Sequence, residues 1–263
     1  MTLITNWSPR VSHNRRPLRI LVLALVVLVS LLTAACADRS QQSESNRKDA
    51  TETEPSANAV IGPLRAQQWR KMQQAGMLRP ECPIVRRSQL RTVSINHFDF
   101  QGNVRRGTVV VNTDVAESMV RILTRLFDAK FPIRRMSPVE NFAGDANKSL
   151  RADNTSAYNC RRADQINAPF SESPHANGRA IDINPRENPW MDLRCRCWFP
   201  SAKEQARDDE PGKIYKRGLV WRTFRAEGWI WQDIDVADYM HFDTGYPSRP
   251  FVPPGSDETG PKN

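Results

Sequence analysis

Histidine, cysteine and glycine are scarce in this sequence. Its 263 residues include 4 His, 5 Cys and 12 Gly, and 8% of them are aromatic. So little glycine excludes a collagen-like chain, and the lack of repeated long apolar runs excludes a protein with several membrane spans. Hydrophobic residues still make up 39%, too many for a wholly disordered chain. The length therefore allows one or two globular domains, in which each His and Cys can be considered individually.

The formal net charge of +9 first suggests an anionic partner such as DNA. Four of the basic residues, however, precede an apolar run from Ile20 to Ala35, and no acidic residue occurs before Asp38. This is the layout of a secretory signal, and the run is short for a membrane span of about 20 residues. Removing residues 1–36 takes away four Arg and no acidic residue, which leaves a charge of +5. We therefore expect no nucleic-acid partner.

The apolar run ends in a sequence that resembles the signal of a bacterial lipoprotein. The last five residues read Leu-Thr-Ala-Ala-Cys, in which Cys36 would be lipidated and become the mature N-terminus. Thr33 stands where this pattern prefers Leu. We expect a lipoprotein anchored to the membrane through Cys36, with ordinary cleavage and secretion, or an uncleaved anchor, as the alternatives. Each of these places the body of the protein outside the cytoplasm.

Composition divides the rest of the chain into three regions. Residues 37–60 are rich in Ser, Gln and Glu and predict a disordered tether, because such a segment buries too little apolar surface to offset its ordering entropy. Residues 61–252 are long enough for a single domain with its own core, and residues 253–263 predict a flexible tail. We expect the chain to be a monomer.

Within this domain, local patterns predict an α+β fold: a small antiparallel sheet with flanking helices. Apolar residues at helical spacing predict a helix after Asn112 or Thr113, with a stripe from Val115 to Leu126. Two further helices are predicted over 65–76 and 216–227. The predicted strands are a hairpin over 90–100 and 104–111, a strand over 131–139, and a final strand from Trp229 towards His241.

Four Cys remain once Cys36 is assigned to lipid, an even number in an oxidising compartment. We favour a disulfide between Cys82 and Cys160, which leaves Cys195 and Cys197 to pair locally. The rival interpretation is a thiolate zinc site, but one residue separates Cys195 from Cys197, less than the gap usual for such ligands.

The residues suited to chemistry concentrate in two stretches, 173–184 and 238–243. Imidazole and carboxylate groups are the ligands of a catalytic zinc, and a turn at Gly178 can bring His175 and Asp182 to one point. His241 must then come from a neighbouring strand, and Asp238, three residues before it, can accept a proton from water. His97, on the predicted strand, is interpreted as a core residue.

These stretches resemble a known family, the VanY-type D-alanyl-D-alanine carboxypeptidases and their relatives among the L-alanyl-D-glutamate endopeptidases. Residues 154–161 are also similar to the stretch that precedes the zinc motif in extracellular members, and the resemblance covers most of Cys82 to Tyr246. Two motifs carry it, in the family's order: Ser173-x-His175-x-x-Gly178-x-Ala180-x-Asp182, then Asp238-x-x-His241.

The resemblance implies a role for each matched residue. His175, Asp182 and His241 would bind Zn²⁺, and Asp238 would be the general base. The family's Arg on an upstream strand, which binds the scissile carbonyl or its oxyanion, would be Arg161, with the adjacent Arg162 as the alternative. Ser173 would either hydrogen-bond the substrate or shape the turn.

The function implied is that of a cell-envelope zinc metallopeptidase that hydrolyses an amide bond in peptidoglycan stem peptides, as a carboxypeptidase or an endopeptidase. An anionic wall would also account for the basic charge. The alternative is a non-catalytic peptidoglycan-binding lipoprotein that retains the fold and the metal, with the His and Asp residues holding a purely structural site. Residues 190–212 depart from the family, and as a lid or a blocked entrance they would change the choice of substrate.

Overall fold

The structure is a computed structural model of the chain and describes residues 54–161, 170–231 and 236–256. The chain divides into two compact units, Met1–Glu54 and Pro55–Asn263, and every described helix and strand lies in the second. The expected signal peptide with Cys36, and residues 37–53 of the expected tether, lie outside the described residues. In the described ranges, no helix is long and apolar enough to cross a membrane.

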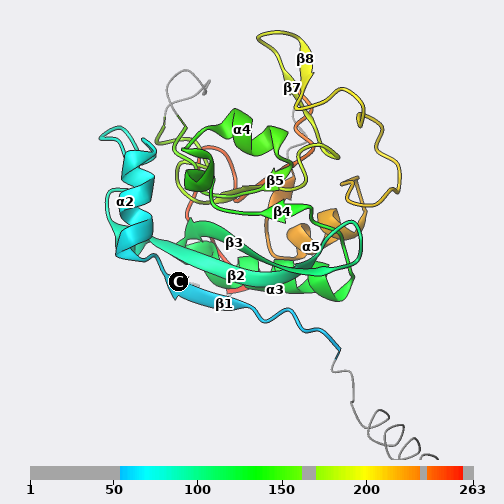
Figure 1. Cartoon of the computed structure of the whole chain (residues 1–263), viewed down its shortest axis with the longest axis horizontal. Coiled ribbons are helices and arrows are strands. Elements are labelled where there is room, and N and C mark those ends of the chain that lie inside the picture. Colours follow the sequence, from blue (N-terminus) through cyan, green and yellow to red (C-terminus); the bar gives the residue numbers. More distant parts are fainter. Residues whose placement is uncertain (1–53, 162–169, 232–235, 257–263) are drawn as a thin grey trace, which may run out of the picture. The chain divides into compact units, whose positions relative to one another are not determined.

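Short helices and short strands share the unit (Figure 1), which confirms the α+β class. The helices are α2 (Ala66–Gln74), α3 (Ala116–Asp128), α4 (Ala146–Arg151) and α5 (Leu219–Ala226), with 3-10 turns η1 (Arg87–Gln89), η2 (Thr113–Val115) and η3 (Val139–Phe142). The strands are β1 (Val60–Pro63), β2 (Leu90–Phe98), β3 (Val104–Asn112), β4 (Arg135–Met136), β5 (Asn154–Thr155), β6 (Ala180–Asp182), β7 (Trp190–Asp192), β8 (Cys197–Phe199), β9 (Ile230–Trp231) and β10 (His241–Asp243).

An antiparallel sheet in the order β1-β2-β3 forms one wall of the core. β2 pairs with β3 along its whole length, so the expected hairpin is confirmed. Val93 and Ile95 of β2 are fully buried in the cluster that contains the apolar stripe of α3. In Figure 1, α3 lies along one face of this sheet, whereas α2, β4 and β5 lie on the other.

A second antiparallel sheet, in the order β6-β10-β9, carries the candidate site. Helix α5 packs against its central strand β10: the ring of Phe224 in α5 stacks on the ring of Phe242 in β10, with 4.0 Å between the centroids. A bridge between Ser156 and Asp182 joins this sheet to the segment after β5. The strands that hold the site, β6 and β10, therefore each have a paired segment on both sides.

Two predicted strands were too long. In the stretch 131–139 only β4 is a strand: Pro132 makes an isolated bridge with Phe98, and Pro138 lacks the N–H group that a β-ladder requires. No single strand runs from Trp229 to His241 either: β9 ends at Trp231 and pairs antiparallel with β10. The chain reverses direction between these two strands.

The folded unit also begins earlier than residue 61. Val60 is the first residue of β1, Ala57 is buried, and the carbonyl of Ala57 accepts a hydrogen bond from the amide of Asn96 at 2.8 Å. The end of the expected tether therefore belongs to the fold.

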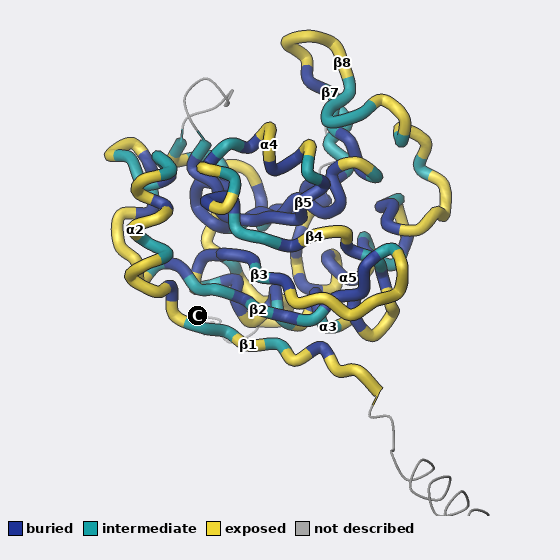
Figure 2. The backbone as a smooth tube through the Cα atoms, viewed as in Figure 1, coloured by how far each residue is buried: buried dark blue, intermediate teal, exposed yellow. Residues whose placement is uncertain are grey.

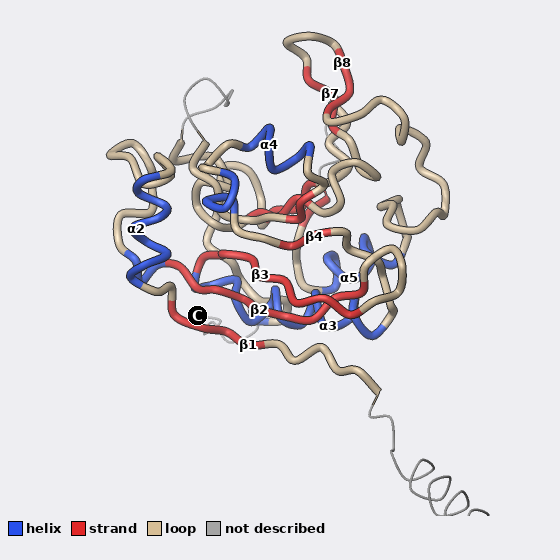
Figure 3. The backbone as a smooth tube through the Cα atoms, viewed as in Figure 1, coloured by secondary structure: helices blue, strands red, loops and turns tan. Residues whose placement is uncertain are grey.

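Both expected disulfides are present, Cys82–Cys160 and Cys195–Cys197. The second lies on the hairpin of β7 and β8, which projects from the body in Figure 1. Figure 2 shows that burial is concentrated along β3 and β5, whereas α2 and the segment after β8 are largely exposed. Figure 3 shows that the chain between β8 and α5 is loop throughout.

Candidate functional site

The residues expected to bind zinc lie on two neighbouring strands and on the turn before one of them. Asp182 ends β6, His241 begins β10, and the antiparallel register places the two residues opposite each other. Cross-strand partners have Cβ atoms about 4.5–5.5 Å apart, so the pairing itself brings a carboxylate next to an imidazole. His175 reaches the same point from the turn that precedes β6.

That turn depends on Gly178. Its amide donates to the carbonyl of His175 at 3.0 Å, and its own carbonyl accepts from the amide of Asn112, at the end of β3, at 2.8 Å. The φ angle of Gly178 is +70°, and an added Cβ would lie 2.7 Å from the Asn112 nitrogen. Only glycine suits this backbone and this close approach.

Three donor atoms converge at the centre of the site. The Nε2 atom of His175 lies 3.0 Å from Nδ1 of His241 and 3.1 Å from Oδ1 of Asp182, and Nδ1 of His241 lies 3.2 Å from the same oxygen. All three side chains are buried. The result is a nearly equilateral triangle of one oxygen and two nitrogens.

The opposite nitrogen of each ring is already used. His175 donates from Nδ1 to the carbonyl of Ala157 at 2.7 Å, and His241 donates from Nε2 to Oδ2 of Asp243 at 2.9 Å. In a neutral imidazole the other nitrogen then carries a lone pair. Two such lone pairs and a carboxylate oxygen within 3.2 Å of one another could together hold a metal ion.

The charges of the buried groups also indicate a site for a cation. Burial disfavours a charged ring, but the hydrogen bonds to Asp182 and Asp243 outweigh it and raise the pKa of His241 to about 10. Burial lowers the pKa of His175, while both histidines, against the effect of burial, hold the pKa of Asp182 well below its usual range. A proton supplies the positive charge in the metal-free protein, and a set of two nitrogens and one oxygen fits Zn²⁺.

Asp238 is held beside this triangle by backbone pairing with the start of β7. Asp238 bridges to Trp190, and the amide of Met191 donates to the carbonyl of Ala237 at 2.8 Å. The Oδ1 atom of Asp238 is buried and has no hydrogen-bond partner among the described residues. Burial raises the pKa of Asp238 to about 6. A carboxylate of this kind is ionised at neutral pH and able to accept a proton.

Arg161 also faces the site, from the loop after β5 rather than from a strand. Its Nη2 atom lies 3.6 Å from Oδ2 of Asp182, and its Nε atom is buried with no partner among the residues that the structure describes. Arg162, the alternative, lies outside the described residues. A cavity of about 10 Å³, room for about one water molecule, is lined here by residues that include Ser156, Asn159, Arg161, His175 and Asp182.

Ser173 contributes to the turn before β6, whereas His97 is a residue of the core. The hydroxyl of Ser173 accepts a hydrogen bond from the amide of Ala176 at 3.4 Å, and its carbonyl accepts from the amide of Asn177 at 3.1 Å. These bonds hold the turn that carries His175, while contact with substrate stays a prediction. His97 is buried in β2 and donates from Nδ1 to the carbonyl of Phe98 at 3.3 Å, as a core residue does.

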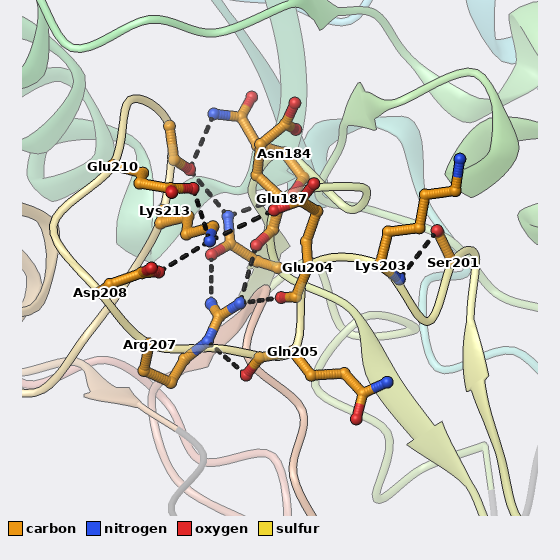
Figure 4. A network of polar contacts seen from close by, with 12 residues as sticks. Asn184, Glu187, Ser201, Lys203, Glu204, Gln205, Arg207, Asp208, Glu210 and Lys213 are labelled. Atoms are coloured by element: carbon orange, nitrogen blue, oxygen red, sulfur yellow. Dashed lines mark hydrogen bonds and ion pairs between the residues drawn. The ribbon is translucent and has the colours of Figure 1, made fainter.

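Two basic side chains, Arg207 and Lys213, hold the charged segment 204–213 in place (Figure 4). The buried ammonium of Lys213 contacts three carboxylates at 2.6–3.2 Å, those of Glu204, Asp208 and Glu210. Arg207 donates to the side chain of Asn188 at 2.9 Å and stacks over the ring of Tyr239 at 4.2 Å. This segment is thus joined to the residue that follows Asp238, and its action as a lid stays a prediction.

Two supporting groups could not be assigned from the sequence. The carbonyl of Ala157 orients His175, and a backbone carbonyl leaves no sequence signal. Asn159 lines the small cavity with its Oδ1 atom buried and without a partner. Asp243, two residues after His241 on β10, accepts a hydrogen bond from the ring of His241.

Comparison with known proteins agrees with the geometry. Residues 167–244 match the family model described as D-alanyl-D-alanine carboxypeptidase, a stretch that includes His175, Asp182, Asp238 and His241 but not Arg161. Searches of the curated proteins and of the solved structures found no match. The segment that carries the site is therefore similar to the D-alanyl-D-alanine carboxypeptidase family of peptidases, which supports the resemblance drawn from the motifs.

Proposed function

We propose that this chain is a zinc peptidase of the bacterial cell envelope that hydrolyses an amide bond in peptidoglycan stem peptides. The observation that carries the proposal is the convergence of His175, Asp182 and His241 on one point, with an unpartnered carboxylate oxygen of Asp238 in the same buried site. The family match supports a peptidase in general. The stem peptide as substrate, and D-alanyl-D-alanine or L-alanyl-D-glutamate as the bond, go beyond that match.

Each residue then has a definite task. Zn²⁺ held by the three ligands would polarise the scissile carbonyl and make water a stronger nucleophile. Asp238 accepts the proton of the attacking water and returns it to the leaving amine, for which its unpartnered Oδ1 is suited. Arg161, whose guanidinium lies 3.6 Å from Asp182, provides positive charge where the carbonyl oxygen becomes negative.

Substitution separates metal binding from catalysis. The Asp238→Ala variant is expected to keep its zinc and to lose activity by a factor of about 10² or more, because proton transfer contributes about 10²–10⁴ to such reactions. His175→Ala is expected to lose both zinc and activity. Metal content by atomic emission and cleavage of a synthetic stem peptide measure the two. An Asp238→Ala variant as active as the parent would remove Asp238 from this role.

The location is part of the proposal. An Arg-rich start, the apolar run and Cys36 support export and lipid anchoring. A peptidase on a polar tether outside the cytoplasm would then meet the wall directly.

A further inference from the structure

A polar groove of about 540 Å³ lies between α2, η3 and the face of the β1-β2-β3 sheet opposite α3. It is separate from the metal site but close to it. Val139 of η3 lines the small cavity beside His175, while the next residues, Glu140 and Asn141, line the groove. The two sites therefore lie on either side of one 3-10 turn, and the proposed function does not use the groove.

The lining of the groove is hydroxyl and amide rather than apolar. Six uncharged side chains that form hydrogen bonds line it: Gln67, Gln68, Thr92, Ser94, Thr108 and Asn141. Hydroxyl groups act as donor and acceptor at once, and side-chain amides offer one of each. The hydroxyls of Ser94 and Thr108 already adjoin each other at 2.8 Å. Such a surface suits a ligand that is itself covered with hydroxyl and amide groups.

A buried acceptor in the groove lacks a partner. Glu140 is only 4% exposed; its Oε1 atom accepts a hydrogen bond from Gln68 at 2.8 Å, but its Oε2 atom has no partner in the described structure. Burial of an unpaired acceptor is energetically unfavourable. A ligand hydroxyl or N–H group would supply the missing donor.

Two basic side chains and the carboxyl group of Glu140 line the groove, which leaves one positive charge in excess when Glu140 is ionised and so favours an acidic ligand. Lys71 and Arg65 line it, and Lys71 donates to the side chain of Asn141 at 2.5 Å, across from α2 to η3. Arg65 occupies the N-cap of α2 without a side-chain cap, and the first turn of α2 contains no acidic residue. The partial positive charge of the helix N-terminus is therefore added to that of the two cations.

We propose that this groove binds the glycan strand of the substrate, as a chain of N-acylated sugars that carries carboxylates. The inference rests on the proposed function, because the stem peptide is attached to such a strand. Hydroxyl and acylamino groups would pair with the neutral lining and with Glu140, and the free carboxylate of a sugar unit that carries no stem peptide would lie against Arg65 and Lys71. A polyol phosphate chain is disfavoured, because two cations are few for a polymer with a charge on every unit.

Calorimetric titration of the full-length protein in detergent tests this. The probes are peptide-free peptidoglycan glycan fragments, whose carboxylates are free, and neutral chitin oligosaccharides of the same length. We expect the acidic glycan to bind at least tenfold more tightly than the neutral one. Absence of binding by the parent protein, or tighter binding of a poly(glycerol phosphate) chain, would overturn the assignment.

Two substitutions on α2 form a matched pair. Lys71→Glu is expected to weaken glycan binding at least tenfold, whereas Arg70→Glu, an equal charge change at an exposed neighbour that does not line the groove, should leave it within twofold. Equal effects of the two would contradict the site. Thr108→Val, which removes one hydroxyl while keeping the shape, is expected to weaken binding several-fold, with thermal unfolding as the check of folding.

The outcome also separates the two proposals. A protein that binds the glycan but cleaves no stem peptide would refute the proposed function alone. A protein that cleaves a glycan-free stem peptide but ignores the glycan would refute only the groove assignment.

Discussion

His241 lies between two carboxylates, with Asp182 at 3.2 Å from its Nδ1 atom and Asp243 at 2.9 Å from its Nε2 atom. These neighbours require positive charge at the ring or directly beside it. In the metal-free protein a proton provides it, which is why the pKa of His241 rises to about 10 although burial opposes the charge. A metal ion at the triangle provides the same charge, so proton and metal compete for one place.

This competition predicts that zinc affinity depends on pH. Below its raised pKa, His241 carries a proton that zinc must displace, whereas His175, whose pKa is lowered by burial, is neutral and releases none. The apparent affinity should therefore rise about tenfold for each pH unit between 6 and 8, with about one proton released. Zinc titrations in buffers of different ionisation enthalpy measure both quantities.

The control for this prediction is Asp243→Asn, which removes one of the two carboxylates. The pKa of His241 should fall and the pH dependence should flatten. A zinc affinity that does not change between pH 6 and pH 8 in the parent protein would show that no proton is displaced.

At the scale of elements, the site is made by the register of β6 and β10 and by the turn that Gly178 closes onto β3. The Cys82–Cys160 disulfide and the hydrogen bond that His175 donates to the Ala157 carbonyl fix the segment on the other side. Each ligand therefore comes from a different backbone environment. The donor triangle depends on all of them together.

The Gly178→Ala variant tests this dependence. A positive φ and a Cβ 2.7 Å from the Asn112 nitrogen should cost about 2 kcal/mol and lower the melting temperature by roughly 4–8 °C. Gly102→Ala is the matched control, because φ there is also positive (+78°) but nothing lies within 4 Å of an added Cβ. Zinc affinity should fall only in Gly178→Ala. Equal melting temperatures for the two variants would contradict the role of the contact with β3.

Sequence patterns predicted the elements whose signals are local. The apolar stripe from Val115 to Leu126 and the alternation in the hairpin are read within one element, and both elements formed as expected. The predicted strands over 131–139 and after Trp229 were too long, because the length of a strand depends on its pairing partner, which the local pattern does not contain. For the same reason Arg161 was expected on a strand but lies in a loop.

For the whole molecule, charge and topology lead to one account. The basic start and Cys36 belong to the segment outside the described residues, and the peptidase unit follows it. Under these proposals, the charge of +5 left after removal of residues 1–36 would suit an anionic wall, and the groove lined by α2 would add a second contact with it. In this account, anchoring, binding and cleavage are functions of separate parts of one chain.

Lipid anchoring is checked by Cys36→Ser. The variant should no longer incorporate labelled fatty acid, because the thiol that would carry the lipid is absent. Its activity on a soluble stem peptide should be unchanged. Fatty-acid labelling that persists in Cys36→Ser would assign the lipid to another residue.

The central claim is that this chain cleaves stem peptides with a metal held by His175, Asp182 and His241. Mass spectrometry of purified muropeptides, both cross-linked and uncross-linked, after incubation with the zinc-loaded protein tests it most directly. The account predicts loss of a terminal D-alanine or cleavage of an internal amide, abolished by a chelator and restored by zinc. Muropeptides that remain intact with zinc-loaded, folded protein would contradict it.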